Sequence, residues 1–256
     1  MVLHLLRGIA MVVLAFPWLS YKARLRVEQR WHRRLLRILN IKIRIHGDAP
    51  DLSVHHMLVV ANHISWLDIY LLNAVRPVNF VSKAEVRSWP IVGWLAYKTG
   101  TIFIDRNKRH DTARVNHQVS SILSNGGCVA IFPEGTTSNG NMLRPFHASL
   151  LQPAIHSNCK IWPVAIRYTH EDGSLNTAPA YVDELTFIDS LKLILSQRII
   201  YAEMVFRQPI DPHGKTRREL AHEAQCTIGA ALNLNVSGRE SEAEAGLETE
   251  LIPAIG

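Results

Sequence analysis

The chain has few cysteines and none of the cysteine spacings that build a disulfide framework or a zinc ribbon. Cys128, Cys159 and Cys226 are the three cysteines among 256 residues, and no two of them form a C-x-x-C pair. Three cysteines cannot all pair with one another, whereas small secreted domains use even sets. The sequence therefore predicts a protein of a reducing compartment.

Several catalytic and binding signatures are also absent. There is no G-x-S-x-G elbow of a serine hydrolase and, despite thirteen histidines, no H-E-x-x-H of a zinc protease. Zinc-finger spacing and aromatic-basic RNA motifs are missing too, which argues against a nucleic-acid partner. There are no internal repeats, so a length of 256 residues with 47% hydrophobic residues predicts one catalytic domain with appendages.

Uncharged apolar sequence is limited at the amino-terminal end. The stretch from Val2 to Tyr21 is interrupted by Arg7 and Pro17, and the uncharged run from Gly8 to Tyr21 is short for a membrane span. A spanning helix with Arg7 at the interface and a helix lying in the interface both stay open. No A-x-A-like site precedes the basic cluster, which disfavours a cleaved signal peptide.

Positive charge is concentrated in one segment. The net charge is +6, but nine Lys/Arg and one acid between Lys22 and Arg44 carry +8, and the rest of the chain carries −2. Basic residues beside an apolar stretch favour anionic lipid as the partner. We expect residues 1–40 to form membrane-anchoring helices, the second an amphipathic helix resting on the membrane. The catalytic domain then lies on the cytoplasmic side of the inner membrane.

Beyond residue 40, short β-rich runs alternate with helical ones, which is typical of an α/β domain with a mixed, largely parallel central sheet flanked by helices. This domain is expected to cover residues 41–235 and to be followed by an acidic flexible tail, 236–256. The expected strands are 42–46, 57–61, 79–82, 101–104, 128–132, 161–167 and 199–206. The expected helices are 66–74, 91–98, 112–124 and 149–157.

Polar residues follow the buried run that ends at Ala61, at the strand end where α/β sheets usually place ligands. If a helix begins near Ser65, His63 lies in the turn and Asp68 in the first helical turn, close enough to bond the imidazole. Aspartate then fixes the tautomer and leaves the other nitrogen to accept a proton. The alternative is structural, because Ser65-x-x-Asp68 also fits a helix capping box.

Two further clusters follow predicted strands. Phe132-Pro133-Glu134-Gly135-Thr136 offers a glycine turn whose N–H groups could hold an oxyanion and a carboxylate that could bind substrate hydroxyls. An ordinary strand-to-loop turn explains it equally well. Gly100–Arg106 places an arginine at the end of a predicted strand, and the planar guanidinium group of arginine can bind two phosphate oxygens at once.

In this order, the segments resemble the glycerolipid acyltransferase family that includes 1-acylglycerol-3-phosphate acyltransferase. The matching blocks are H-x4-D at His63–Asp68, a G-x-x-F-I-x-R-like block at Gly100–Arg106, F-P-E-G-T at Phe132–Thr136 and a proline-containing strand at Ile161–Ala165. The segment Lys83-Ala84-Glu85 also matches, and the resemblance covers roughly Leu58 to Arg167.

The resemblance implies transfer of a fatty acyl group from acyl-carrier protein or acyl-CoA to a glycerolipid hydroxyl, with no bound cofactor or metal. His63 would be the base and Asp68 would orient it, with no acyl-enzyme formed. Gly135 and Thr136 would stabilise the oxyanion. Arg106 and Lys83 would hold the acceptor's phosphate, and Glu134 would also contact substrate.

The acceptor is less well defined than the chemistry. Many family members that acylate lysophosphatidic acid have arginine where this chain has Thr137, and Arg144 is the nearest substitute in sequence. We expect 1-acylglycerol-3-phosphate as acceptor, giving phosphatidic acid. A lyso-ornithine lipid or another lysophospholipid is the alternative acceptor. A non-catalytic membrane lipid-binding protein is the alternative of another class.

Overall fold

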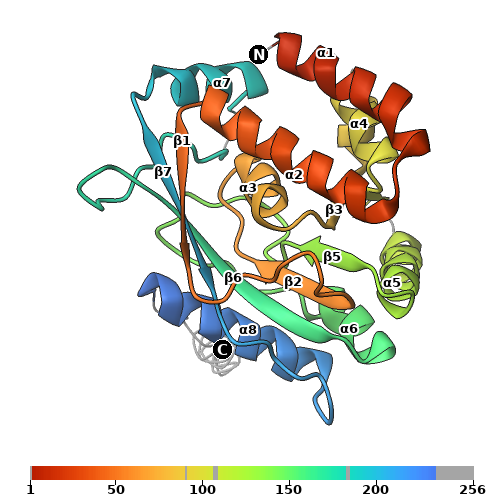
Figure 1. Cartoon of the computed structure of the whole chain (residues 1–256). Helices are drawn as coiled ribbons and strands as arrows, with labels where there is room; N and C mark the ends of the chain where they lie inside the picture. Colours follow the sequence, from red (N-terminus) through yellow and green to blue (C-terminus); the bar gives the residue numbers. More distant parts are fainter. Residues whose placement is uncertain (1, 90, 106–108, 183–184, 235–256) are drawn as a thin grey trace, which may run out of the picture.

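A seven-stranded sheet lies at the centre of the structure, a computed structural model that describes residues 2–89, 91–105, 109–182 and 185–234 (Figure 1). The strands are β1 (Ile41–His46), β2 (Met57–Ala61), β3 (Asn79–Lys83), β4 (Ile102–Ile104), β5 (Cys128–Ile131), β6 (Lys160–Thr169) and β7 (Ile200–Phe206). The helices are α1 (Val2–Ala10), α2 (Tyr21–Ile38), α3 (Leu67–Val75), α4 (Val92–Lys98), α5 (Arg109–Ser124), α6 (Gln152–Ser157), α7 (Phe187–Ser196) and α8 (Arg217–Leu232).

The sheet is mixed but mostly parallel. Its order is β1-β7-β6-β2-β5-β3-β4, and only the β6–β7 pair is antiparallel. β2 lies between β6 and β5, with Val60 opposite both Pro163 and Ile131. The carboxyl ends of β2, β5, β3 and β4 therefore meet at one edge, where a switch in strand order opens a crevice for ligands.

Helices cover both faces of the sheet (Figure 1). All five residues of β2 are buried, as expected for a central parallel strand. Alternate side chains enter different cores: Val59 packs with residues of α2 and α3, whereas Leu58 and Val60 pack with residues of α5 and α8. The expected fold class is confirmed for the catalytic part of the chain.

The amino-terminal segment differs from the expectation. α1 is followed by a π-helical turn (Met11–Ala15) and a 3-10 turn (Phe16–Trp18) containing Pro17, and α2 starts after Ser20 caps it. In the part of the chain that the structure describes, every helix is too short or too polar to cross a bilayer. Contact of this segment with a membrane stays a prediction.

The expectation that the apolar side of α2 rests on a membrane is wrong. Leu35, Leu36 and Leu39 are buried in the core beside the sheet, and Arg33 and Gln29 donate hydrogen bonds to backbone carbonyls at the end of α3. Helical spacing shows that a helix buries one side, but the spacing is the same whether protein or lipid covers that side.

The seven expected strands are confirmed, with ends shifted by one or two residues. Helices α7 and α8 were not among the expected elements. Thr186 caps α7, and Thr216 with Glu219 forms a capping box on α8, so both starts carried a local signal. The acidic tail expected at 236–256 lies outside the described residues.

Candidate active site

Asp68 is the hub of the loop that follows β2. Its Oδ2 atom accepts hydrogen bonds from Nδ1 of His63 (2.8 Å), the Ile64 backbone N–H (2.7 Å) and the Ser65 backbone N–H (2.9 Å). Its Oδ1 atom accepts from the hydroxyl of Tyr168 at 2.7 Å. The side chain of Asp68 is fully buried. One carboxylate thus bonds the loop backbone and orients the histidine. Only half of the expected capping box forms, because the Ser65 hydroxyl accepts from the Leu67 N–H instead of the Asp68 N–H.

The hydrogen bonds around Asp68 fix the tautomer of His63. An ionised carboxylate can only accept hydrogen bonds, so each group bonded to Asp68 must donate to it. His63 therefore carries its proton on Nδ1 and leaves Nε2 as an acceptor. The His63 side chain is 19% exposed. Its ring stacks on Phe132, with centroids 4.0 Å apart and planes inclined by 10°. Phe132 therefore covers one face of the imidazole and Asp68 holds it at Nδ1, while Nε2 has no partner among the described residues.

Glu134 joins the two strand-end loops. Its Oε1 accepts from the His63 backbone N–H at 2.7 Å and its Oε2 accepts from the Arg144 backbone N–H at 3.0 Å. The residue is 3% exposed. Burial raises the pKa of Glu134 to about 7, and the two backbone N–H donors partly offset that rise. Both oxygens serve the backbone, an arrangement that fits positioning of His63 better than contact with substrate.

The glycine turn follows β5 directly beside His63. Gly135 has φ 76°, a left-handed conformation that a residue without a Cβ adopts at low cost, and its N–H closes the turn on Phe132 O. Thr136 is exposed, and its N–H has no partner in the described part of the chain. Thr137 donates its hydroxyl to the Tyr181 carbonyl. Within the described residues, the Thr136 N–H is therefore not used by the turn itself.

Of the residues expected to bind phosphate, the structure describes Lys83 and Arg144. Lys83 is exposed at the carboxyl end of β3, opposite Ile104 of β4 and at the same edge of the sheet as the histidine loop. Arg106 lies outside the described residues. Arg144 is exposed on the loop that Glu134 holds. The structure therefore brings His63, Asp68 and Glu134 into direct contact and leaves Lys83 at the rim.

Sequence reasoning missed two residues that complete this arrangement. Tyr168 reaches Asp68 from β6, and Asn62 donates to the Ile166 carbonyl (2.9 Å) and accepts from the Ile166 N–H (2.7 Å). Asn62 directly precedes His63, so its place in the sequence could have indicated a role in the site. No local sequence signal indicates Tyr168, because it lies 100 residues away from Asp68.

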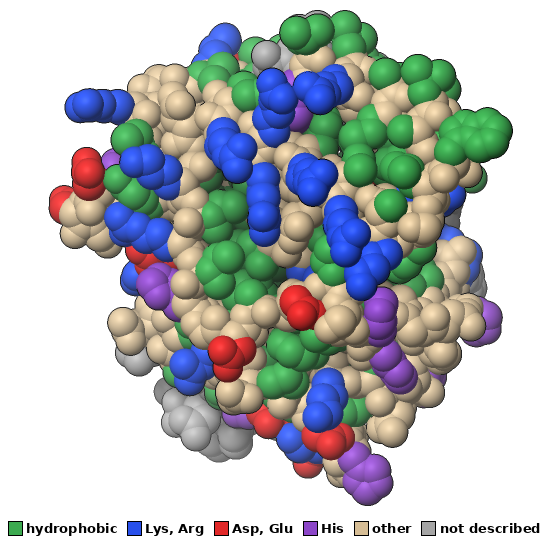
Figure 2. All heavy atoms as spheres, viewed as in Figure 1, with side chains coloured by type: hydrophobic (Ala, Val, Ile, Leu, Met, Phe, Trp, Pro, Cys, Tyr) green, Lys and Arg blue, Asp and Glu red, His purple; other side chains and the backbone are tan. Residues whose placement is uncertain are grey.

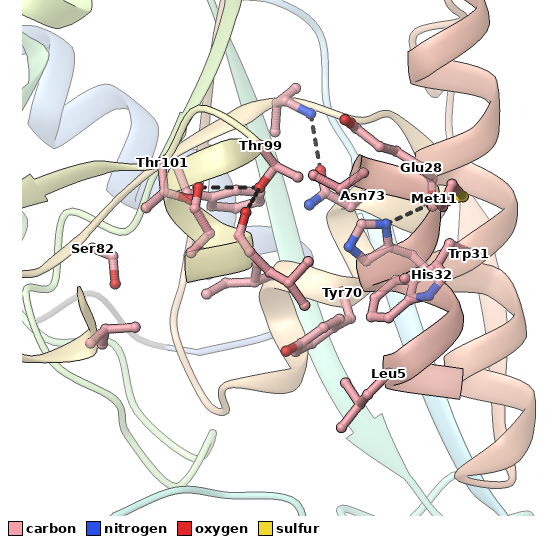
Figure 3. Close-up of a pocket in the computed structure, with 18 of the residues that line it drawn as sticks. Leu5, Met11, Glu28, Trp31, His32, Tyr70, Asn73, Ser82, Thr99 and Thr101 are labelled. Atoms are coloured by element: carbon pink, nitrogen blue, oxygen red, sulfur yellow. Dashed lines mark hydrogen bonds between the residues drawn. The ribbon is translucent and has the colours of Figure 1, made fainter. Parts of the chain in front are cut away.

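An apolar cavity of about 140 Å³ runs from the amino-terminal helices along β3 (Figure 3). Its walls come from α1 and the turns after it, α2, α3, β3 and α4, and include Leu5, Met11, Trp31, Tyr70 and Phe80. The ring of Phe80 stacks on Phe132 at 6.0 Å, and Phe132 stacks on His63. One wall residue of the cavity, Phe80, is thus linked to the imidazole through the ring of Phe132.

Comparison with known proteins identifies the family. The family model described as Acyltransferase matches residues 42–167. The chain is 38% identical to lyso-ornithine lipid O-acyltransferase of Pseudomonas aeruginosa over 84% of this chain and 85% of that one. It is 42% identical to 1-acyl-sn-glycerol-3-phosphate acyltransferase of Neisseria meningitidis, over 59% of each chain.

A solved structure has the same fold. The crystal structure of the 1-acyl-sn-glycerophosphate acyltransferase of Thermotoga maritima superposes with a TM-score of 0.62 at 21% identity, covering 91% of this chain and 95% of that one. At this identity the match supports the architecture alone. The family model and the sequence relatives show that the chain belongs to the acyltransferase family and is an O-acyltransferase.

Proposed function

We propose that this enzyme transfers a fatty acyl group from a thioester, acyl-carrier protein or acyl-CoA, to the free hydroxyl of a lyso-lipid, with His63 as general base. The observation that carries the proposal is the bond between Nδ1 of His63 and Asp68, which leaves Nε2 of this partly exposed side chain as the nitrogen that can accept a proton. Aspartate bonded to Nδ1 also stabilises the imidazolium that forms.

The reaction needs no acyl-enzyme. Nε2 of His63 takes the proton of the acceptor hydroxyl while its oxygen attacks the thioester carbonyl. The N–H of Thr136 stabilises the oxyanion of the tetrahedral intermediate. When the intermediate collapses, the carbon–sulfur bond breaks and the leaving thiolate takes the proton from His63. Glu134 acts by holding the backbone of His63, in place of the substrate contact expected from sequence.

The apolar cavity along β3 is suited to the acyl chain of the donor. Its walls are largely aliphatic and aromatic, and one of them, Phe80, stacks on Phe132, which stacks on His63. A chain bound there places its thioester at the carboxyl end of β3 and its far end beneath α1 and α2. Burying methylene groups supplies about 0.8 kcal/mol each, which suits a site that must hold a long chain.

For the acceptor, we propose a lyso-ornithine lipid. Two observations support it. The relative similar over 84% of this chain carries that name. Thr137 stands where many family members that acylate lysophosphatidic acid are expected to have arginine, and its hydroxyl is bonded to the Tyr181 carbonyl. Lysophosphatidic acid is the second candidate, because Lys83 and Arg144 offer cations near the histidine loop and the Neisseria relative is 42% identical.

We further propose that the enzyme works on the cytoplasmic face of the inner membrane. Leu3, Leu14 and Trp18 are 81%, 69% and 87% exposed on the amino-terminal segment. Figure 2 shows basic side chains gathered along α2 beside apolar side chains. The exposed basic residues of α2 are Lys22, Arg26, Arg30, Arg33, Arg34 and Arg37. Apolar insertion with neighbouring cations suits an anionic membrane.

The test is an acyl-transfer assay with labelled acyl-CoA and acyl-carrier protein against lyso-ornithine lipid and lysophosphatidic acid. Wild-type enzyme is expected to acylate the former faster. His63→Ala should lower the rate at least a thousandfold without changing the melting temperature. His117→Ala, an exposed histidine on α5, is the matched control. Substantial turnover by His63→Ala would overturn the mechanism, and preference for lysophosphatidic acid would reverse the choice of acceptor.

A further inference from the structure

A second cavity, of about 210 Å³, adjoins the apolar one at the end farther from His63. Its lining includes Tyr21, Arg24, Glu28, Asn79, Lys98 and Thr99. Phe16, Glu28, Val78 and Thr99 line both cavities, so the two share one wall. Unlike its mainly apolar neighbour, this second cavity has a lining that is about half polar and half apolar. Together they offer an apolar and a more polar compartment side by side.

Two cations of the polar cavity have unused donors. Arg24 donates from Nε to the Leu19 carbonyl, and its terminal nitrogens have no bond within the described residues. Lys98 is exposed, and its ammonium group lies 6.0 Å from the ring centroid of Trp94. Glu28 is close enough to Arg24 to feel its charge, yet no salt bridge joins them in the described part of the chain. The cavity can therefore accept an anion.

Strand β3 contributes residues to both cavities and ends at the active-site edge of the sheet. Asn79 at its start lines the polar cavity, Phe80 and Ser82 line the apolar one, and Lys83 at its end lies at the active-site edge. At about 3.3 Å per residue, the strand separates the polar cavity from that edge by roughly 13 Å. A lipid with its head group in the polar cavity would therefore lie with its chain pointing toward His63.

We propose that the polar cavity binds the carboxylate of a free long-chain fatty acid, whose chain fills the apolar cavity from the end opposite His63. The inference rests on the proposed function, in which the same apolar cavity receives the acyl chain of the donor. Fatty acid and acyl donor then exclude one another. Free fatty acid is a competitive inhibitor with respect to the acyl donor.

Glu28 favours a carboxylate over a phosphate dianion in this cavity. An acid beside the two cations reduces the positive charge available to a doubly charged head group. Burial raises the pKa of Glu28 to about 7, although Arg24 opposes the rise. At neutral pH part of the population is protonated, and a protonated Glu28 can donate a hydrogen bond to a carboxylate.

A binding assay tests the site without turnover. Trp31 lines the apolar cavity, so 9,10-dibromostearate bound there should quench its fluorescence. Arg24→Gln and Lys98→Gln should each raise the dissociation constant about tenfold, as expected for the loss of a charge-assisted contact. Arg26→Gln removes the same charge from the exposed side of α2 and should leave it unchanged. Trp31→Phe should abolish most of the quenching.

Inhibition kinetics complete the test. Palmitate should raise the KM of the wild-type enzyme for acyl-CoA without changing kcat, and Arg24→Gln should raise its inhibition constant about tenfold. Hexadecanol, which lacks the carboxylate, should inhibit at least tenfold less. Equal effects of Arg24→Gln and Arg26→Gln, or equal inhibition by hexadecanol, would overturn the site. Because quenching is measured on His63→Ala as well, failure of the site and failure of the proposed reaction give different results.

Discussion

The hydroxyl of Tyr168 donates a 2.7 Å hydrogen bond to Oδ1 of Asp68, the carboxylate oxygen that faces away from His63. Both residues are fully buried. The bond holds the plane of the carboxylate and so fixes Oδ2 against the imidazole. Tyr168 thereby positions His63 through Asp68, without itself reaching the substrate.

Tyr168→Phe should therefore lower kcat about tenfold and leave KM nearly unchanged. The variant leaves Oδ1 without its donor, a loss of about 1.5–3 kcal/mol for a hydrogen bond to a charged group. Steady-state kinetics and thermal unfolding measure the two effects. Tyr97→Phe, at an exposed tyrosine of α4, is the control. An unchanged kcat would show that Asp68 is held well enough by the backbone N–H groups alone.

Gly135→Ala should damage activity more than stability. A Cβ at φ 76° costs about 1 kcal/mol, and the turn that presents the Thr136 N–H would shift to relieve it. Gly173→Ala provides the comparison, because Gly173 also has a positive φ (86°) and lies in an open turn with nothing within 4 Å of a built Cβ. Similar losses of melting temperature are expected, with a fall in kcat for Gly135→Ala only. Equal kcat in both variants would contradict a role for this turn.

Glu28 should make the enzyme less stable as the pH rises. Burial raises its pKa to about 7 from an ordinary value of 4.5, so the folded chain holds a proton that the unfolded chain has released between these values. The stabilisation is complete below about pH 4.5 and is lost as the pH rises through about 7. The side chain of Glu28→Gln stays neutral at every pH and so escapes this loss. The unfolding free energy of the variant minus that of wild type should therefore be about 2 kcal/mol larger at pH 8 than at pH 5.

Urea unfolding at several pH values measures this difference. Glu85→Gln, at an exposed carboxylate, should show no such trend. A difference between Glu28→Gln and wild type that stays constant with pH would mean that the carboxylate is better solvated than its burial indicates.

Trp18→Glu should weaken membrane binding. The indole is 87% exposed beside the basic surface of α2. Replacing it with an acid removes the apolar area that the membrane would bury and adds repulsion from anionic lipid. Co-sedimentation with vesicles containing phosphatidylglycerol should show about tenfold weaker partitioning. Leu175→Glu changes an exposed leucine on the 170–175 turn and should have no effect. Equal partitioning of all three proteins would remove Trp18 from the membrane contact.

The strands and the histidine pair could be predicted because their signals are local. β2 is apolar throughout, and His63 and Asp68 are five residues apart in one loop. The partnership of Asp68 with Tyr168 could not be predicted, since it depends on the register that places Ala61 of β2 opposite Val164 of β6. No local pattern encodes that register.

The hydrogen bonds of Glu134 could not be predicted for a related reason. Carboxylates in a glycine turn suit substrate hydroxyls, and the sequence does not show that backbone N–H groups from two loops already meet both oxygens. The two cavities likewise depend on how α1 and the turns after it fold over α2. The stack of His4 on Trp31, with centroids 4.6 Å apart, joins residues that lie 27 positions apart.

That stack has a practical consequence. A chain shortened to begin at Ser20 would still contain the strands of the sheet, Asp68 and His63. It would lose Leu5, Met11 and Phe16, which form one wall of the apolar cavity. Inhibitors selected against such a chain would be fitted to an open groove, and those that fill the groove would collide with α1 when residues 2–19 are present.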